Sequence, residues 1–132
     1  MSLGADFVVN AAEVDPVDAI QKLGGVDVAL VLAASPRVFE QAFASLRRGG
    51  RLICVALPAE GSMSIPIFET VLKGISIIGS NVGTRQDLAE VCALYAAGRT
   101  KVIAESRRLD QVNEAMAEVL SSKVPARLVF EF

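Results

Sequence analysis

Residues 26–34 read VDVALVLAA, an almost unbroken apolar run in which Asp27 is the one charged residue. A strand with one wet face alternates apolar and polar residues, whereas a continuous run is typical of a parallel strand covered by helices on both faces. Residues 52–57, LICVAL, form a second run of this kind. We therefore expect a fold built around buried parallel strands.

Helix signals alternate with these strands. Asp15-Pro16 and Ser35-Pro36 each combine a preferred N-cap residue with proline at the first helical position. The first of these helices is expected to run to Leu23 and to end at the following glycine pair. The spacing of short connections between strands and helices indicates an α/β domain.

The second helix carries one apolar stripe at helical spacing, made by Phe39, Ala42, Phe43 and Leu46. Arg47-Arg48 would then occupy its last turn, where the helix dipole favours cations, and Gly49-Gly50 would end it. The remaining expected elements are strands at 7–9, 75–80, 102–104 and 128–132, and helices at 65–73, 84–97 and 110–120.

Three local signals support those later elements. Thr84 and Asp87 form a capping-box-like pair at the start of one helix, and Asp110 is the expected N-cap of the last one, which Pro125 would end. The short strand 75–80, with its polar Ser76, suits the edge of a sheet. This order of strands and helices, with right-handed crossovers, predicts a parallel sheet.

Composition excludes several classes of protein. The 132 residues are 52% hydrophobic and 21% charged, with a formal net charge of −2. No basic stripe and no apolar stretch of about 18–20 residues is present, so we expect no nucleic-acid partner and no membrane span. The apolar excess has two interpretations: strands buried on both faces, or a chain that has lost a partner surface.

The absence of histidine limits the chemistry further. Without histidine the chain has no serine–histidine or cysteine–histidine dyad and no histidine-ligated metal. Cys54 and Cys92 stand alone, with no C-x-x-C motif, and we interpret them as reduced, buried thiols of a cytoplasmic protein.

Ligands of parallel sheets bind outside the carboxyl ends of the strands, which selects loops 33–37, 56–61 and 79–85. Small and aliphatic residues at Val55-Ala56-Leu57 would let a flat ring approach the backbone; the alternative is an ordinary strand exit. Gly79 and Gly83 flank a polar strand end that could contact a ligand; the alternative is a turn before a helix. Arg127 could hold a phosphate bidentately, or could be a solvated charge.

Several stretches together resemble the C-terminal part of the zinc-dependent, medium-chain alcohol dehydrogenases. The most specific is the phrase from Lys73 to Asp87. The others are Leu3-Gly4-Ala5-Asp6, residues 27–34, Leu46-Arg47-Arg48-Gly49-Gly50-Arg51-Leu52, Ala56-Leu57-Pro58, residues 66–80, residues 82–88 and Val112-Asn113-Glu114-Ala115. The likeness covers essentially residues 4–132.

The resemblance implies a partial Rossmann-like parallel sheet with flanking helices, lacking the first βαβ unit. Residues 1–83 would be the second half of a dinucleotide-binding domain, and residues 84–132 a segment that packs on the catalytic domain. It also implies NAD as cofactor, with NADP not excluded. Zinc would belong to the parent enzyme only, because the catalytic domain with its Cys and His ligands and the glycine-rich phosphate loop should precede Gly4.

The resemblance also assigns roles to single residues. The backbone of Val55, Ala56 and Leu57 and that of Ser80, Asn81 and Val82 would hold the nicotinamide end of NAD. Ala33 would line the adenosine-ribose and nicotinamide side of the crevice, and Arg127 would reach the pyrophosphate, although Ala126 stands before it where glycine is common.

We therefore expect a piece of an NAD(H)-dependent alcohol dehydrogenase that is inactive alone and lacks its N-terminal catalytic domain. One alternative is the zinc-free quinone or enoyl reductase branch of the same superfamily. Another is a non-catalytic, self-associating module. In that case the edge strand 75–80 and the exposed flank of 26–34 would pair with another chain and give a homodimer or larger assembly.

Overall fold

The computed structural model describes residues 3–59, 61–122, 124 and 127–132. The chain divides into two compact units, Met1–Thr84 and Arg85–Phe132. Each unit has its own sheet, and each is described by itself.

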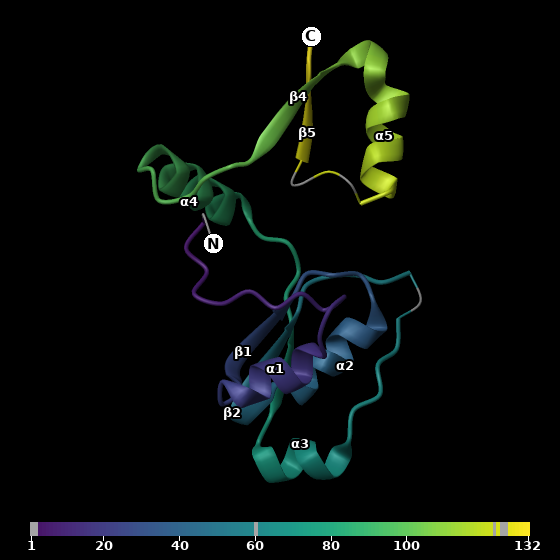
Figure 1. Ribbon diagram of the computed structural model, residues 1–132. Coiled ribbons are helices and arrows are strands. Elements are labelled where there is room, and N and C mark those ends of the chain that lie inside the picture. Colours follow the sequence, from purple (N-terminus) through teal and green to yellow (C-terminus); the bar gives the residue numbers. More distant parts are fainter. Residues whose placement is uncertain (1–2, 60, 123, 125–126) are drawn as a thin grey trace. The chain divides into compact units, whose positions relative to one another are not determined.

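The first unit alternates helix and strand along the chain (Figure 1). Its sheet has the order β1-β2-β3, and both strand pairs are parallel. The predicted α/β class with a parallel sheet is confirmed. The elements are α1 (Pro16–Lys22), β1 (Val26–Val31), α2 (Pro36–Ala44), β2 (Leu46–Cys54), α3 (Ile67–Lys73) and β3 (Ser76–Gly79).

The predicted helix starts are confirmed. The side chain of Asp15 accepts hydrogen bonds from the amides of Val17 and Asp18, at 2.8 and 3.1 Å, and so satisfies two donors that a helix start leaves unpaired. Ser35 is the N-cap of α2 by backbone conformation but makes no side-chain cap bond, so Pro36 at the first position marks that start. Gly74 ends α3 in the left-handed conformation, with φ 63°.

The expectation that Arg47 and Arg48 lie in the last helical turn is wrong. Helix α2 ends at Ala44, and Leu46 already pairs with Val26 of β1. The pairing then shifts, because Val28 is opposite Arg51, so residues 47–50 bulge out of the ladder. A glycine pair after a helix also suits a bulge, because a glycine at positive φ lets the chain turn there.

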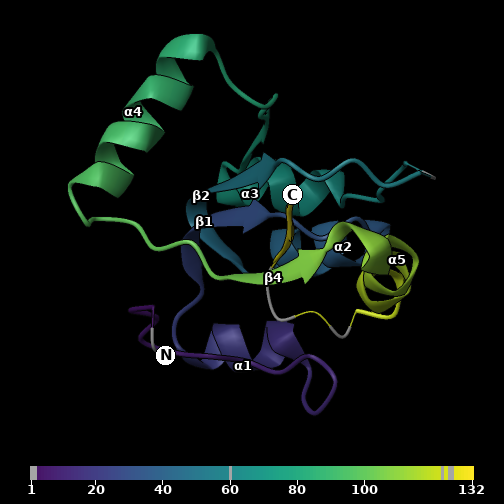
Figure 2. The same cartoon turned by 90° about the horizontal axis from the view of Figure 1, so that it is seen from above.

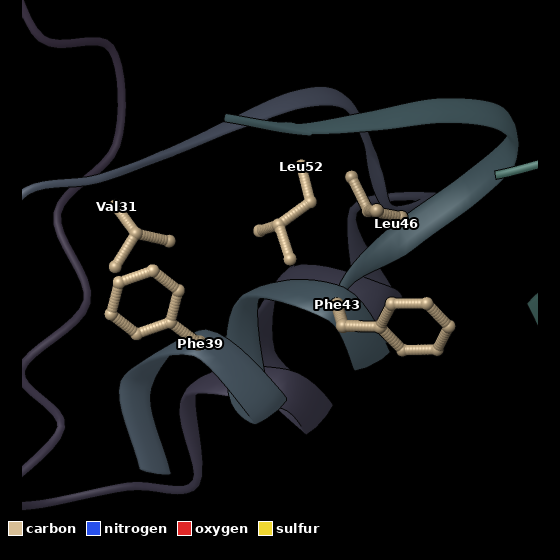
Figure 3. Close-up of a cluster of buried hydrophobic side chains, with 5 residues drawn as sticks. All are labelled: Val31, Phe39, Phe43, Leu46 and Leu52. Atoms are coloured by element: carbon tan, nitrogen blue, oxygen red, sulfur yellow. The ribbon is translucent and has the colours of Figure 1, made fainter. Parts of the chain in front are cut away.

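The core of this unit lies between α2 and the sheet. Figure 3 shows Phe39 beside Val31 and Phe43 beside Leu46, with Leu52 between the two pairs. All five side chains are buried. Phe39 and Phe43 of the predicted stripe therefore mark the face that α2 buries against β1 and β2, whereas Leu46, the last residue of that stripe, belongs to β2.

The predicted strand at Phe7-Val8-Val9 is wrong. These residues pair with no strand of the described structure, and Phe7 and Val8 are exposed. Figure 2 shows this segment as an extended coil beside α1. A strand requires a hydrogen-bonded neighbour, and among the described residues the outer edge of β1 has none.

The second unit contains a two-stranded parallel sheet of β4 (Ala104–Arg108) and β5 (Arg127–Glu131). Its helices are α4 (Arg85–Ala96), the 3-10 turn η1 (Leu109–Gln111) and α5 (Val112–Leu120). The terminal strand was predicted, but the strand expected at 102–104 lies further along the chain, because pairing with β5 begins at Ala104. Asp110 lies inside η1, so it is not the N-cap of α5. Pro125 lies outside the described residues.

Candidate functional site

The three parallel strands of the first unit end in register. Val31 is opposite Cys54, and Cys54 is opposite Gly79. The loops that follow these three strand ends contain Ala33, residues 55–57 and residues 80–82, respectively. Because carboxyl ends of neighbouring parallel strands share one edge, the structure brings these seven predicted residues to the same edge of the sheet.

Backbone hydrogen bonds hold two of these loops. The amides of Val55 and Ala56 both donate to the carbonyl oxygen of Val31, at 3.2 and 3.0 Å, and the amide of Ser80 donates to that of Cys54 at 2.9 Å. These three donors are therefore engaged within the protein. The amide of Leu57 has no hydrogen-bond partner within the described residues, which leaves it available to a ligand.

A cavity of about 270 Å³ opens at the carboxyl end of β2. Its walls come from the start of α2, the end of β2 and the loop that follows: Pro36, Phe39, Cys54, Ala56, Leu57, Pro58, Gly61, Ser62 and Met63. Pockets for a whole drug-sized ligand are larger, about 300–1,000 Å³. The cavity therefore suits one flat, largely apolar ring of a larger ligand.

The other predicted residues at this edge stand outside the cavity wall. Ala33, Ser80 and Asn81 are exposed, and Val82 is 95% exposed with φ 20°. Val55 is half-buried and does not line the cavity. Of the seven, Ala56 and Leu57 line the cavity itself.

Arg127 lies in the second unit, as the first residue of β5 opposite Ala104. It borders a separate, mostly apolar cavity of about 420 Å³ between α5 and β5, together with Ala115, Met116, Val119, Leu120, Leu128 and Phe130. Ala126, the residue before Arg127 at which the sequence differs from the pattern it resembles, lies outside the described residues.

The second unit also holds an ion-pair cluster around Arg107. Its guanidinium donates to Glu118 of α5 at 3.1 Å and to Glu105 of β4 at 3.0 Å. The hydrogen bonds that Arg107 donates to Glu118 and then to Glu105 raise the pKa of Arg107 above its ordinary value. Arg107 is thus charged throughout the ordinary pH range, and the cluster ties α5 to β4.

The thiols differ from the sequence interpretation. Both cysteines are free; Cys54 is half-buried at the cavity and Cys92 is exposed on α4, so the expectation of two buried thiols is wrong for Cys92. Cys92 lies on α4, which buries no residue in the described structure.

The donor set does not fit a zinc ion. The sequence has no histidine, and the two cysteines lie in different units. Among the described residues, no three His, Cys, Asp or Glu side chains are grouped as metal ligands would be. Within the same residues, no helix has both the length and the apolar character that crossing a membrane requires.

Sequence reasoning missed part of the cavity wall. The strand-end rule selected loops 33–37 and 56–61, and Pro36 in the first of them does line the cavity. Phe39 was identified only as part of the apolar stripe of its helix, and its contribution to the cavity wall was not anticipated. Met63 lies in an irregular loop, where no periodic pattern identifies a lining residue.

Comparison with known proteins decides the family. A model of the zinc-binding dehydrogenases matches residues 1–97, most of the chain. The chain belongs to the zinc-binding dehydrogenase family. Two curated relatives of this zinc-binding dehydrogenase are alcohol dehydrogenases. That of Geobacillus stearothermophilus is 42% identical over 130 residues, and that of Moraxella sp. (strain TAE123) is 43% identical over 131 residues.

Solved structures agree with the family. The alcohol dehydrogenase of the hyperthermophilic archaeon Aeropyrum pernix superposes with a TM-score of 0.89 at 31% identity, over 98% of this chain and 38% of that one. The two curated relatives are likewise covered over 98% of this chain and 38% of their own length. This zinc-binding dehydrogenase chain thus spans less than half of the proteins it matches.

Proposed function

We propose that this chain is the part of an NAD(H)-dependent alcohol dehydrogenase that holds the nicotinamide end of the cofactor. The observation that carries the proposal is the cavity at the carboxyl end of β2, in a chain whose relatives are alcohol dehydrogenases. Its apolar wall and its volume suit one flat ring.

The residues at this edge would act mainly through the backbone. The amide of Leu57, which has no partner among the described residues, would donate to the carboxamide of the ring, and the small side chain of Ala56 would let the ring approach the strand. Ser80, Asn81 and Val82 would bound the ring from the neighbouring loop, and Ala33 would face the ribose. Bound NAD supplies the hydride acceptor for alcohol oxidation.

The remaining parts of the proposal concern the whole enzyme. Residues 1–83 would be the second half of the dinucleotide-binding domain, and residues 84–132 would pack on a catalytic domain, with Arg127 reaching the pyrophosphate. Zinc would be held by residues outside this chain, whose own donors do not fit it. We therefore propose that the 132 residues alone do not turn over alcohol, and that the enzyme is cytoplasmic.

A titration of the chain with NADH tests the proposal. Ala56→Leu fills the cavity and is expected to lower the affinity for NADH at least tenfold, while Ala12→Leu, at an exposed position of the same unit, leaves it unchanged. The same titration with NADPH distinguishes the two cofactors. Equal NADH affinity in both variants, or ethanol turnover by the 132 residues alone, would contradict the proposal.

We also propose that the chain self-associates through β3. This strand is an edge of its sheet, and Ile77 and Ile78 are exposed, as are Ile67 and Phe68 of the neighbouring α3. The accessible surface is 10281 Å², whereas separate compact bodies of 84 and 48 residues would expose about 8,000 Å² together. The difference exceeds the roughly 800 Å² that a standard interface buries on each partner.

Sedimentation of the chain at micromolar concentration tests this second proposal. A dimer or larger species is expected. Ile77→Lys places a charge on the edge and should shift the chain toward monomer, while Val14→Lys, at an exposed position away from the sheet, should not. A monomer at all concentrations, or equal shifts in the two variants, would overturn the pairing through β3.

A further inference from the structure

The connection between β2 and α3 is the long irregular segment of the first unit. It runs from residue 55 to residue 66, and Gly61, Ser62 and Met63 form one wall of the cavity. Met63 and Ile65 also pack, partly buried, against the core cluster. The shape of the cavity thus depends on where residues 61–65 are held.

One side chain of α2 holds this segment. Oε1 of Glu40 accepts a hydrogen bond from the amide of Ser64 at 2.9 Å, across a sequence separation of 24 residues. Within the described residues, no other hydrogen bond joins residues 57–65 to the rest of the unit. Backbone amides bound to a carboxylate form charge-assisted bonds, which are stronger than neutral ones.

Helix α2 supplies another part of the wall of the same cavity through Pro36 and Phe39. Glu40 follows Phe39 directly, so one helix both lines the cavity and anchors the loop that faces that lining. We propose that Glu40 is a positioning residue that fastens residues 61–65 over the cavity and thereby sets the affinity for the ring bound there. The nature of that ring rests on the proposed function; the fastening of the loop does not.

Amide hydrogen exchange of the 132-residue chain tests the fastening without any ligand. Glu40→Ala removes the acceptor, and the amide of Ser64 should exchange roughly 3- to 10-fold faster. Glu40→Gln keeps an oxygen acceptor and should restore most of the protection. Arg37→Ala, on the same helix and with no hydrogen bond or ion pair to the loop among the described residues, is the matched control and should leave the exchange of Ser64 unchanged.

A titration with NADH then tests the consequence for binding. Glu40→Ala should weaken NADH binding by a factor similar to the gain in exchange, with rescue by Glu40→Gln, in titrations at a temperature where both variants are folded. A purely structural role of Glu40 would lower the thermal midpoint but leave the NADH affinity of the folded chain unchanged. Unchanged exchange at Ser64 overturns the fastening, and faster exchange with unchanged NADH affinity overturns its role in binding.

The two proposals fail separately. If the unsubstituted chain binds no NADH while Glu40→Ala accelerates exchange at Ser64, the fastening stands and the proposed cofactor falls. If NADH binds and depends on Ala56 while exchange is unchanged, the cofactor site stands and the role of Glu40 falls.

Discussion

Replacing Leu52 by alanine should remove much of the stability of the first unit. The side chain is 0% exposed and lies in the core cluster with Val31, Phe39, Phe43 and Leu46. Leucine-to-alanine changes in packed cores cost about 2.7–5.0 kcal/mol, with the lower values where neighbours relax into the space. Half-buried neighbours of this cluster can relax in that way, so we expect about 3 kcal/mol.

That loss is large for a unit of this size. A body of 84 residues has a free energy of unfolding of roughly 4–13 kcal/mol. A change of about 3 kcal/mol raises the unfolded-to-folded ratio more than about a hundredfold. The variant should still fold but should lose most of the protection of its core amides against exchange.

Amide exchange in β2 is the suitable assay. The chain has no tryptophan, and its single tyrosine, Tyr95, lies in the second unit, so intrinsic fluorescence does not report on this core. Leu57→Ala is the matched control, because the same atoms are removed from a side chain that is 90% exposed, and it should change stability by less than about 0.5 kcal/mol. Equal losses in the two variants, or a loss below about 1 kcal/mol for Leu52→Ala, would refute the assignment of the core.

Three further changes test local features. Asp15→Ala removes both cap bonds of α1 and should cost about 1 kcal/mol, with rescue by Asp15→Asn, measured by urea unfolding. Gly50→Ala should destabilise clearly more than Gly79→Ala, because its new Cβ would lie 2.8 Å from the carbonyl oxygen of Arg47 while that at Gly79 meets nothing within 4 Å; thermal midpoints compare them. Arg107→Ala should increase amide exchange in α5, and about 1 M salt, where the screening length falls to about 3 Å, should shrink the difference from the unsubstituted chain; a difference that salt leaves unchanged would contradict an ionic tie.

Local patterns predicted the parts of the fold that depend on local physics. The continuous run at 26–34 identified β1, and proline after an N-cap residue identified the starts of α1 and α2. These signals work because burial and backbone preference act on the residues that carry them.

Pairing partners explain the errors. Phe7-Val8-Val9 has the side chains of a strand but no neighbouring strand within the described residues. In contrast, β4 is mostly polar, AESRR, yet forms a strand because β5 pairs with it. By local preference alone, Arg47-Arg48 suits the end of a helix as well as a strand. The pairing of Leu46 with Val26 places these residues in β2 instead. Whether such a segment forms a strand depends on a pairing partner far away in the chain, which the local sequence pattern does not reveal.

The site divides in the same way. The rule that ligands bind at the carboxyl ends of parallel strands placed residues 55–57 and 80–82 at one edge of the sheet from the sequence alone. The cavity wall at Met63 and the anchor at Glu40 depend on how an irregular loop folds back on α2, and no periodicity describes that.

In the part of the chain that the structure describes, the outer edges of β1 and β3 have no neighbouring strand, and this affects how stability is measured. An unpaired strand edge exists as a binding surface only while the chain is folded, so any strand that adds to it favours the folded state by mass action. The apparent stability of such a chain rises with its own concentration when copies pair, and with the concentration of any peptide that pairs there. If copies pair as proposed, unfolding midpoints measured at rising protein concentration should increase, and the slope of that increase measures how strongly the edge is occupied.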